Sequence, residues 1–524
     1  MTQSRDSSAP LQTGMDRRDF LTGAAALGVA GATVGPLAGP AEAQTPRRGG
    51  HLILGLNAGS TSDSLDPARH VASYMSNLGP QFSDALTVVD ESAKVKPALA
   101  VSWDPKPGAK EWVIKLRRGV TFHNGKEMTA ADVVYSINHH RGADSKSVIR
   151  SLVAQFTEVK ATDKYEVTIA LNSGNADLPF VLAEQRMPVA PDASNFTDGM
   201  GTGAFILESF EPGVRARVKK NPNDWRSDRG WVDTVESLAI PNATARLAAL
   251  QSGAVHLIDR IDPKGVAALE ANPKLQVFNT TGSAHCCFAM WIDTAPFDNL
   301  DLRLALKYAI DRPAILRTVL RGSGKIGNDH PIAGFHPYFA SDIPQRGYDP
   351  DKAKFHYQKS GHSGPLSLAI ADVTFAGAVD MAQLFQATAL RAGINIDVNR
   401  VPNDGYWSNV WLKRPFVGTY WAGRTTADLL FSAAYASNAT WNESHWKRPK
   451  FDELLIQARA ELDDAKRRRM YQDMQLMLHE EGGSIIPAFY NYIVAGDARL
   501  AGYVPNPVLD MAGFRAAEKV WFAS

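Results

Sequence analysis

The sequence is poor in cysteine and carries almost no net charge. Two of its 524 residues are cysteine, too few for a disulfide framework. Lys and Arg total 56 and Asp and Glu total 55, a net charge of +1. Nucleic-acid binders usually present a strongly basic face, so this balance argues against a nucleic-acid partner. Beyond the N-terminus, no apolar run approaches the roughly 20 residues of a membrane-spanning helix. We therefore expect a large soluble protein, long enough for about three lobes.

Motifs for catalysis and cofactor binding are also missing. Residues 322–325 (Gly-Ser-Gly-Lys) lack the leading glycine of a phosphate-binding loop. Residues 361–364 are one residue short of the turn that exposes a nucleophilic serine in hydrolases. His479 has no second histidine one helical turn away, as a zinc protease would require. The sequence therefore predicts no catalytic residue, no metal site and no cofactor.

Two pairs of neighbouring residues could suggest chemistry and are better explained as ordinary structure. Cys286 and Cys287 lie inside an apolar run, where a disulfide between neighbours would be strained and buried thiols behave as small hydrophobes. His139 and His140 send their rings in different directions on a helix, so we expect ordinary surface residues. We predict a structural role for the two cysteines and no special role for the two histidines.

The N-terminus resembles an export signal. Arg17-Arg18-Asp19-Phe20-Leu21 precedes an apolar run rich in glycine and alanine, which ends before Ala41-Glu42-Ala43. The small residues of this last tripeptide are typical of a signal-peptidase site. The paired arginines resemble a twin-arginine signal, which exports folded proteins. We predict that residues 1–43 are a signal peptide and that the mature protein is periplasmic.

Strand and helix patterns alternate along the mature chain. Residues 50–56 read as an opening strand between glycines, and residues 111–117 alternate apolar and polar side chains as a half-buried strand does. Strand and helix patterns also alternate over residues 234–259 and 378–401. This order predicts an α/β protein whose sheets are covered by helices. Because no flexible linker is recognisable, we expect the chain to pass between lobes more than once.

Several motifs together resemble one family. The strongest match is residues 97–103, 112–126 and 129–136, which include Trp-Val-Ile-Lys-Leu-Arg-Arg-Gly-Val-Thr-Phe-His-Asn-Gly-Lys. Residues 65–67 (Leu-Asp-Pro), 201–205 (Gly-Thr-Gly-Ala-Phe), 242–253 and 296–312 match further family segments in the same order. This set resembles the family 5 extracytoplasmic solute-binding proteins, which include the dipeptide-, oligopeptide- and nickel-binding components of ABC importers. The resemblance covers residues 50–520.

The resemblance implies an architecture and a role. It implies the two-lobed α/β periplasmic-binding-protein fold (type II, cluster C) with an extra subdomain in the first lobe. We expect lobe I at 44–285 with the inserted subdomain at about 84–204, lobe II at 286–492, and a return to lobe I at 493–524. The implied function is a non-enzymatic receptor that closes over a peptide or similar small solute. Its implied partners are this ligand and the permease subunits of an ABC importer in the inner membrane, and we expect a monomer.

The resemblance also directs attention to residues 421–428. In the peptide binders of the family, an aspartate shortly after the tryptophan that matches Trp421 pairs with the α-amine of the peptide. Arg424 stands at that place here. One hypothesis is that Arg424 binds an anionic or polar group of the ligand. A structural ion pair from Arg424 to Asp428, or a displaced role of Asp428 as the amine partner, remain alternatives.

Aromatic residues gather in the same region. Five of the eleven tryptophans lie between residues 403 and 446, and aromatic walls are common in ligand clefts. We therefore expect ligand contacts from Asn403, Trp407, Trp421, Arg424, Asn442 and His445 in the second lobe and from Ser60 to Asp63 in the first. The alternatives are an exported binding module for signalling or for haem or metal capture, and an exported hydrolase on the same scaffold.

Overall fold

The computed structural model describes residues 45–524 except residues 71, 143, 404–405 and 524. The predicted signal peptide lies outside these described residues. Within the part of the chain that is described, no helix has the length and hydropathy needed to cross a membrane. Residues 46–524 form one compact unit.

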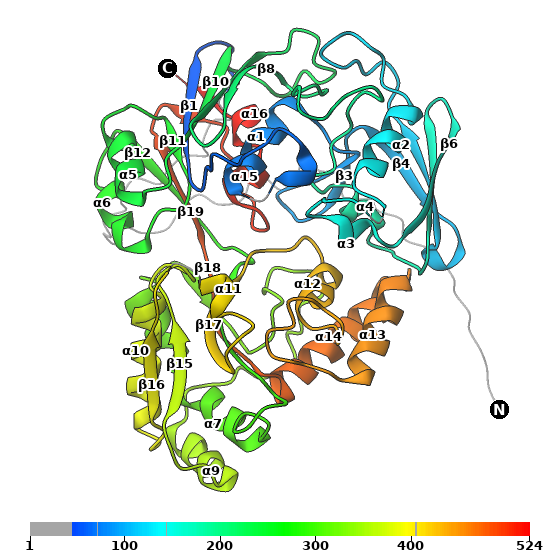
Figure 1. Ribbon diagram of the computed structural model, residues 1–524. Helices are drawn as coiled ribbons and strands as arrows, with labels where there is room; N and C mark the ends of the chain where they lie inside the picture. Colours follow the sequence, from blue (N-terminus) through cyan, green and yellow to red (C-terminus); the bar gives the residue numbers. More distant parts are fainter. Residues whose placement is uncertain (1–44, 71, 143, 404–405, 524) are drawn as a thin grey trace, which may run out of the picture. The chain divides into compact units, whose positions relative to one another are not determined.

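A seven-stranded sheet forms the centre of lobe I (Figure 1). Its strand order is β12 (Leu275–Thr280), β19 (Tyr492–Asp497), β11 (Leu257–Ile258), β1 (His51–Leu56), β10 (Thr234–Ala239), β9 (Arg215–Lys220) and β8 (Phe205–Glu211). The predicted opening strand is confirmed as β1, which pairs in parallel with β10 and β11. Leu52, Leu54 and Leu56 of β1 are buried. Helices α1 (Ser73–Phe82) and α5 (Ala243–Gln251) contact strands of this sheet, and α16 (Ala516–Lys519) contacts α1.

A second sheet of six strands belongs to lobe II. Its order is β14 (Gly324–Ile326), β18 (Ser484–Tyr490), β13 (His285–Met290), β17 (Phe416–Trp421), β15 (Leu366–Ile370) and β16 (Ile396–Arg400). Its helices include α7 (Leu300–Ala309), α9 (Pro350–Ser360), α10 (Ala378–Leu390), α12 (Ala427–Ala434), α13 (Pro449–Ala460) and α14 (Asp464–Glu481). Cys286 and Cys287 lie side by side in β13 as buried free thiols, as expected for core residues.

The inserted subdomain has a sheet and a core of its own. Strands β4 (Ala100–Pro105), β5 (Glu111–Leu116), β7 (Glu166–Leu171) and β6 (Phe156–Asp163) form a four-stranded sheet in this order. Helix α2 (Ala130–His139) packs on it. Asp132 accepts hydrogen bonds from the backbone and side chain of Thr129, so the helix begins at a capping box. The apolar side chains of these elements form a separate cluster.

The surface position expected for His139 and His140 is wrong. The His140 side chain is buried and its Nδ1 lies 2.8 Å from Ser147 Oγ. His139 is only half-buried, stacks 3.8 Å from Phe196 between ring centres and pairs with Asp66 at 2.7 Å. The two rings do point in different directions, but Asp66 and Phe196 from distant loops contact His139, and Ser147 from the segment after the helix contacts His140.

The chain crosses between the two large sheets in two adjacent segments. One segment joins β12 to β13, and the other joins β18 to β19. Thr280 pairs with Tyr492 on one side of the crossing, and the backbone N–H of Tyr490 donates to Ala284 O at 3.0 Å on the other. Paired crossing segments explain why no flexible linker is recognisable. The numerical lobe boundaries given above stay predictions.

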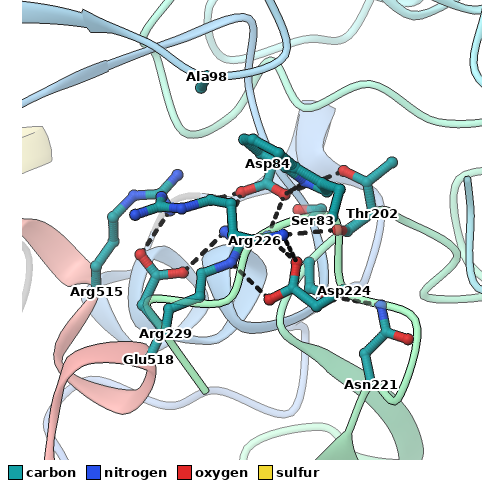
Figure 2. Close-up of polar contacts among 12 residues, drawn as sticks. Ser83, Asp84, Ala98, Thr202, Asn221, Asp224, Arg226, Arg229, Arg515 and Glu518 are labelled. Atoms are coloured by element: carbon teal, nitrogen blue, oxygen red, sulfur yellow. Dashed lines mark hydrogen bonds and ion pairs between the residues drawn. The ribbon is translucent and has the colours of Figure 1, made fainter. Parts of the chain in front are cut away.

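A buried ionic network ties the C-terminal segment to lobe I. Arg229 is 2.7 Å from Asp84, 2.8 Å from Asp224 and 3.1 Å from Glu518 of α16 (Figure 2). Arg515 also pairs with Glu518 at 2.8 Å. Burial alone would raise the pKa of Asp84, but Arg229 holds it well below its usual range. The returning chain is therefore held by matched charges as well as by apolar packing.

Candidate functional site

A group of aromatic side chains lies at the end of β17 and around it. We call Trp407, Trp411, Tyr420, Trp421 and Trp441 the aromatic cluster. Trp407 contacts both Trp411 and Tyr420, with ring centres 5.6 Å apart in each pair, and Trp441 lies 6.4 Å from Trp411 and 6.1 Å from Trp421. Trp407 and Trp441 are 37% and 44% exposed, whereas Trp421 is buried. The cluster therefore has a buried base and two rings that are open to a ligand.

The base of the cluster is fixed by a buried carboxyl group that the sequence analysis missed. Glu443 accepts hydrogen bonds from Trp411 Nε1 at 2.7 Å and from Trp421 Nε1 at 2.9 Å, one on each oxygen. Burial raises the pKa of Glu443 to about 6, although the two indole N–H groups favour its charged form. Glu443 thus holds two indoles in place, and its side chain is buried beneath them.

Arg424 follows this cluster on a tight backbone turn. Gly423 packs so closely that an added Cβ would lie 2.1 Å from Ser283 Oγ and 2.3 Å from Val508 O. Arg424 is half-buried, its Nη1 donates to Ala422 O and Gly423 O, and its guanidinium lies 6.0 Å from the ring centre of Trp421. Burial lowers the pKa of Arg424. The turn thus places a cation beside the buried base of the aromatic cluster.

The ion pair that was an alternative for Arg424 is not formed. Asp428 is buried and pairs instead with Arg459, whose Nε lies 2.9 Å from Asp428 Oδ1. Asp428 Oδ1 also accepts a hydrogen bond from Ser432 Oγ. The carboxylate is thus engaged within lobe II, and among the described residues no acidic side chain pairs with Arg424.

The turn at Arg424 lies where lobe II meets the rest of the molecule. The charged groups that act on Arg424 are Glu184 and Arg186 of the inserted subdomain. The next residue, Thr425, lines a small cavity together with residues of the inserted subdomain (Ala183, Gln185, Pro188) and of the C-terminal segment (Leu509, Gly513, Arg515). This cavity measures about 40 Å³, space for a few water molecules and not for a peptide.

Asn442 and His445, which were expected to contact ligand, make contacts within lobe II. Asn442 Nδ2 donates to Trp446 O at 2.6 Å, and Asn442 Oδ1 accepts from Trp446 N at 2.8 Å. His445 Nδ1 lies 2.7 Å from Asp293 Oδ1, and its ring stacks on Trp291 at 4.3 Å. These contacts shape the loop that carries Trp441 and Glu443.

The remaining expected residues lie in loops. Asn403 is exposed, and its side-chain oxygen accepts from Val373 N at 3.0 Å. In lobe I, Asp63 Oδ2 accepts from Ser60 N at 2.8 Å and Ser60 Oγ lies 2.8 Å from Ser62 Oγ. Among the described residues no hydrogen bond or ion pair joins this loop to the aromatic cluster. The structure thus brings Trp407, Trp421 and Arg424 together and leaves Ser60 and Asp63 in a separate loop of the other lobe.

A family model decides what kind of protein has this site. Residues 94–443, well over half of the chain, match the model described as "Bacterial extracellular solute-binding proteins, family 5 Middle". The chain belongs to this family. Two relatives of the solute-binding protein are the heme-binding protein A of Haemophilus influenzae and the dipeptide-binding protein of Escherichia coli. The first is 26% identical over 459 residues (79% of this chain and 83% of the relative), and the second is 25% identical over 483 residues (83% and 88%).

Solved structures of similar proteins confirm the fold. The periplasmic binding protein DppA of Helicobacter pylori in complex with the peptide STSA matches with a TM-score of 0.77 and 22% identity, over 91% of this chain and 99% of that one. The substrate-binding protein CtaP of Listeria monocytogenes matches with a TM-score of 0.80 and 20% identity, over 91% and 100%. The solute-binding protein therefore has the two-lobed type II fold with the inserted subdomain that the sequence motifs predict.

Proposed function

We propose that this solute-binding protein is the receptor of an ABC importer for a peptide or peptide-like small solute. Membership in the family is the observation that carries the proposal. The dipeptide-binding protein and several glutathione-binding proteins among the relatives support the ligand class. On this proposal the ligand closes the two lobes over itself, and permease subunits in the inner membrane recognise the closed form.

The ligand contacts follow from the geometry of lobe II. Trp407 and Trp441 offer exposed ring faces, Glu443 fixes the rings behind them, and Arg424 supplies a charge. We further propose that Ser60 and Asp63 close on the ligand from lobe I, that Asn403 contributes from its exposed loop, and that Asn442 and His445 act by shaping the loop that carries Trp441. The protein would act as a monomer without catalysis, and the twin-arginine signal at residues 1–43 would direct it to the periplasm.

Capture of haem is the second candidate, because heme-binding protein A is among the relatives. Haem iron is commonly held by a histidine or a cysteine, and in some proteins by a methionine or a tyrosine. His445 pairs with Asp293 and stacks on Trp291, and both cysteines are buried. The geometry therefore favours a peptide-like ligand over haem.

Identification of the natural ligand tests the proposal. Mature protein purified from its own periplasm would be denatured, and the released small molecules would be identified by mass spectrometry. The refolded protein would then be titrated with these molecules while its thermal unfolding is followed. We expect one peptide-like compound to raise the melting temperature and to remain chemically unchanged. Conversion of that compound to a product would contradict a receptor function and favour the hydrolase, and release of haem alone would favour haem capture.

A further inference from the structure

Arg424 is a cation without a matching anion. Its Nη1 donates to two backbone carbonyl oxygens of its own turn, at 3.3 Å to Ala422 O and 3.1 Å to Gly423 O. Among the described residues its Nε and Nη2 donate to no acceptor, and no carboxylate forms an ion pair with it. A half-buried guanidinium usually has such a partner, because burial without one costs free energy.

Four carboxylates of lobe II and the inserted subdomain have partners other than Arg424. Glu443 accepts one indole N–H on each oxygen, and Asp428 pairs with Arg459. Glu184 is 2.8 Å from Arg186, and Asp293 is 2.7 Å from His445. Among the described residues, each of these carboxylates thus has its own partner, whereas the guanidinium of Arg424 has no carboxylate partner.

The orientation of the guanidinium suits a planar acid. Because the two carbonyl oxygens hold Nη1, the edge formed by Nε and Nη2 is the part left for a ligand. Two parallel N–H donors on one edge match the two oxygens of a carboxylate. Next to this cation lie Trp421 at 6.0 Å and, further along the cluster, the exposed rings of Trp441 and Trp407.

From these contacts we infer that the ligand is an amphipathic organic acid, whose carboxylate or similar anionic group binds the Nε–Nη2 edge of Arg424 and whose apolar part covers Trp441 and Trp407. This inference rests on the proposed receptor function and names its ligand class. A free ammonium group near Arg424 would be repelled by the guanidinium, and the four carboxylates named above already have other partners. A peptide would therefore bind with an acidic group, and not its α-amine, at this end of the site.

Three charge forms of one dipeptide test this inference. The probes are N-acetyl-leucyl-phenylalanine, which is an anion, leucyl-phenylalanine, which is a zwitterion, and leucyl-phenylalanine amide, which is a cation. Each would be titrated by calorimetry into the mature chain after any bound ligand has been removed by unfolding and refolding. We expect the acetylated anion to bind at least about tenfold more tightly than the amide, the size of one charge-assisted hydrogen bond.

Substitutions of Arg424 separate its charge from its shape. Arg424→Gln should weaken binding of the acetylated dipeptide by about 10- to 100-fold and binding of the amide by less than about threefold. Arg424→Lys should keep part of the affinity, because it retains the charge and loses the two-pronged contact. Arg391→Gln, which changes an exposed arginine after α10, is the matched control and should leave all three affinities unchanged. Thermal unfolding of each variant checks that it is folded.

The outcomes separate this inference from the receptor function. If the amide binds as tightly as the acetylated form, or if Arg424→Gln weakens all three probes equally, the inference is overturned and the receptor function stands. If none of the probes binds, the ligand released from the purified protein is identified instead, and the presence or absence of an acidic group in it tests the inference. An acidic compound that is absent from Arg424→Gln supports the inference, and a compound without an acidic group overturns it. If no probe binds and no ligand is released, both the inference and the receptor function fail.

Discussion

Arg467 of α14 in lobe II lies 2.6 Å from Asp177 at the start of α4 (Leu178–Val181) in the inserted subdomain, between Nη2 and Oδ2. Both side chains are more than nine-tenths buried. Beside this ion pair, the backbone N–H of Ala176 donates to Arg459 O at 2.7 Å. A charged contact thus links the inserted subdomain to lobe II.

The first prediction concerns this ion pair. Asp177→Asn leaves Arg467 buried without its counter-ion, a change that typically costs about 3–5 kcal/mol. Urea denaturation of the ligand-free mature chain should show a loss of stability in this range. Because the pair joins the inserted subdomain to lobe II, small-angle X-ray scattering of the ligand-free variant should also show a larger radius of gyration than the wild type.

A second contact between the lobes provides the control. Lys264 and Asp380 of α10 lie 2.9 Å apart, but both side chains are about half exposed. Solvent screens such a pair, so Asp380→Asn should change the free energy of unfolding by no more than about 1 kcal/mol. Equal effects of the two substitutions would mean that burial of Arg467 and Asp177 is not what stabilises the contact.

The second prediction concerns the base of the aromatic cluster. In Glu443→Gln, one carboxylate oxygen is replaced by an NH₂ group, so Trp411 or Trp421 loses its acceptor. A buried N–H group without a partner costs about 1–3 kcal/mol. We expect a loss of stability of this size together with a change in the tryptophan emission spectrum. Glu270→Gln, at an exposed position on α6 (Val266–Glu270), should change neither quantity.

The third prediction is a loss of stability in acid. Burial lowers the pKa of His140 from 6.5 to about 4, and burial together with Arg186 does the same for His70. The unfolded chain therefore binds more protons between these values, so stability is present above pH 6.5 and is lost as the pH falls towards 4. Each of these histidines should cost about 2 kcal/mol between pH 7 and pH 5.

Urea denaturation at a series of pH values measures this loss. His140→Gln should reduce the difference between pH 7 and pH 5 by the contribution of one histidine. A pH dependence that is the same in wild type and His140→Gln would show that His140 is already accessible to protons in the folded protein.

The sequence predicts the fold better than the site. The strand at 111–117 and the repeated strand–helix patterns are local signals, and the structure has them within a few residues. The sequence points to Trp407 and Trp421 as candidate ligand contacts because aromatic residues are concentrated in one segment. Glu443 was missed because a single acid in a polar segment has no periodic signal. Its burial depends on Trp411 and Trp421, which approach it only in the folded chain.

Contacts between distant segments explain the other differences. His139 and His140 were expected at the surface because the pattern of one helix says nothing of the loop around Asp66 that covers its end. The partner of Asp428 could not be chosen among many arginines, and the structure pairs it with Arg459 of α13. Local periodicity thus predicts elements, whereas burial and charge pairing depend on how these elements meet.

The last prediction distinguishes a tryptophan that contacts the ligand from a tryptophan that stabilises the core of lobe II. Trp441 is exposed and joined to Trp411 and Trp421 only through ring contacts, whereas Trp446 is fully buried between Phe451 and Arg448. Trp441→Ala should therefore weaken binding of N-acetyl-leucyl-phenylalanine by about 2 kcal/mol, the size of a strong aromatic contact, and leave the melting temperature within a few degrees. Trp446→Ala should instead cost about 3–5 kcal/mol of stability, because it leaves a cavity in the core. If Trp441→Ala binds this probe as the wild type does, the ring of Trp441 does not contact the ligand.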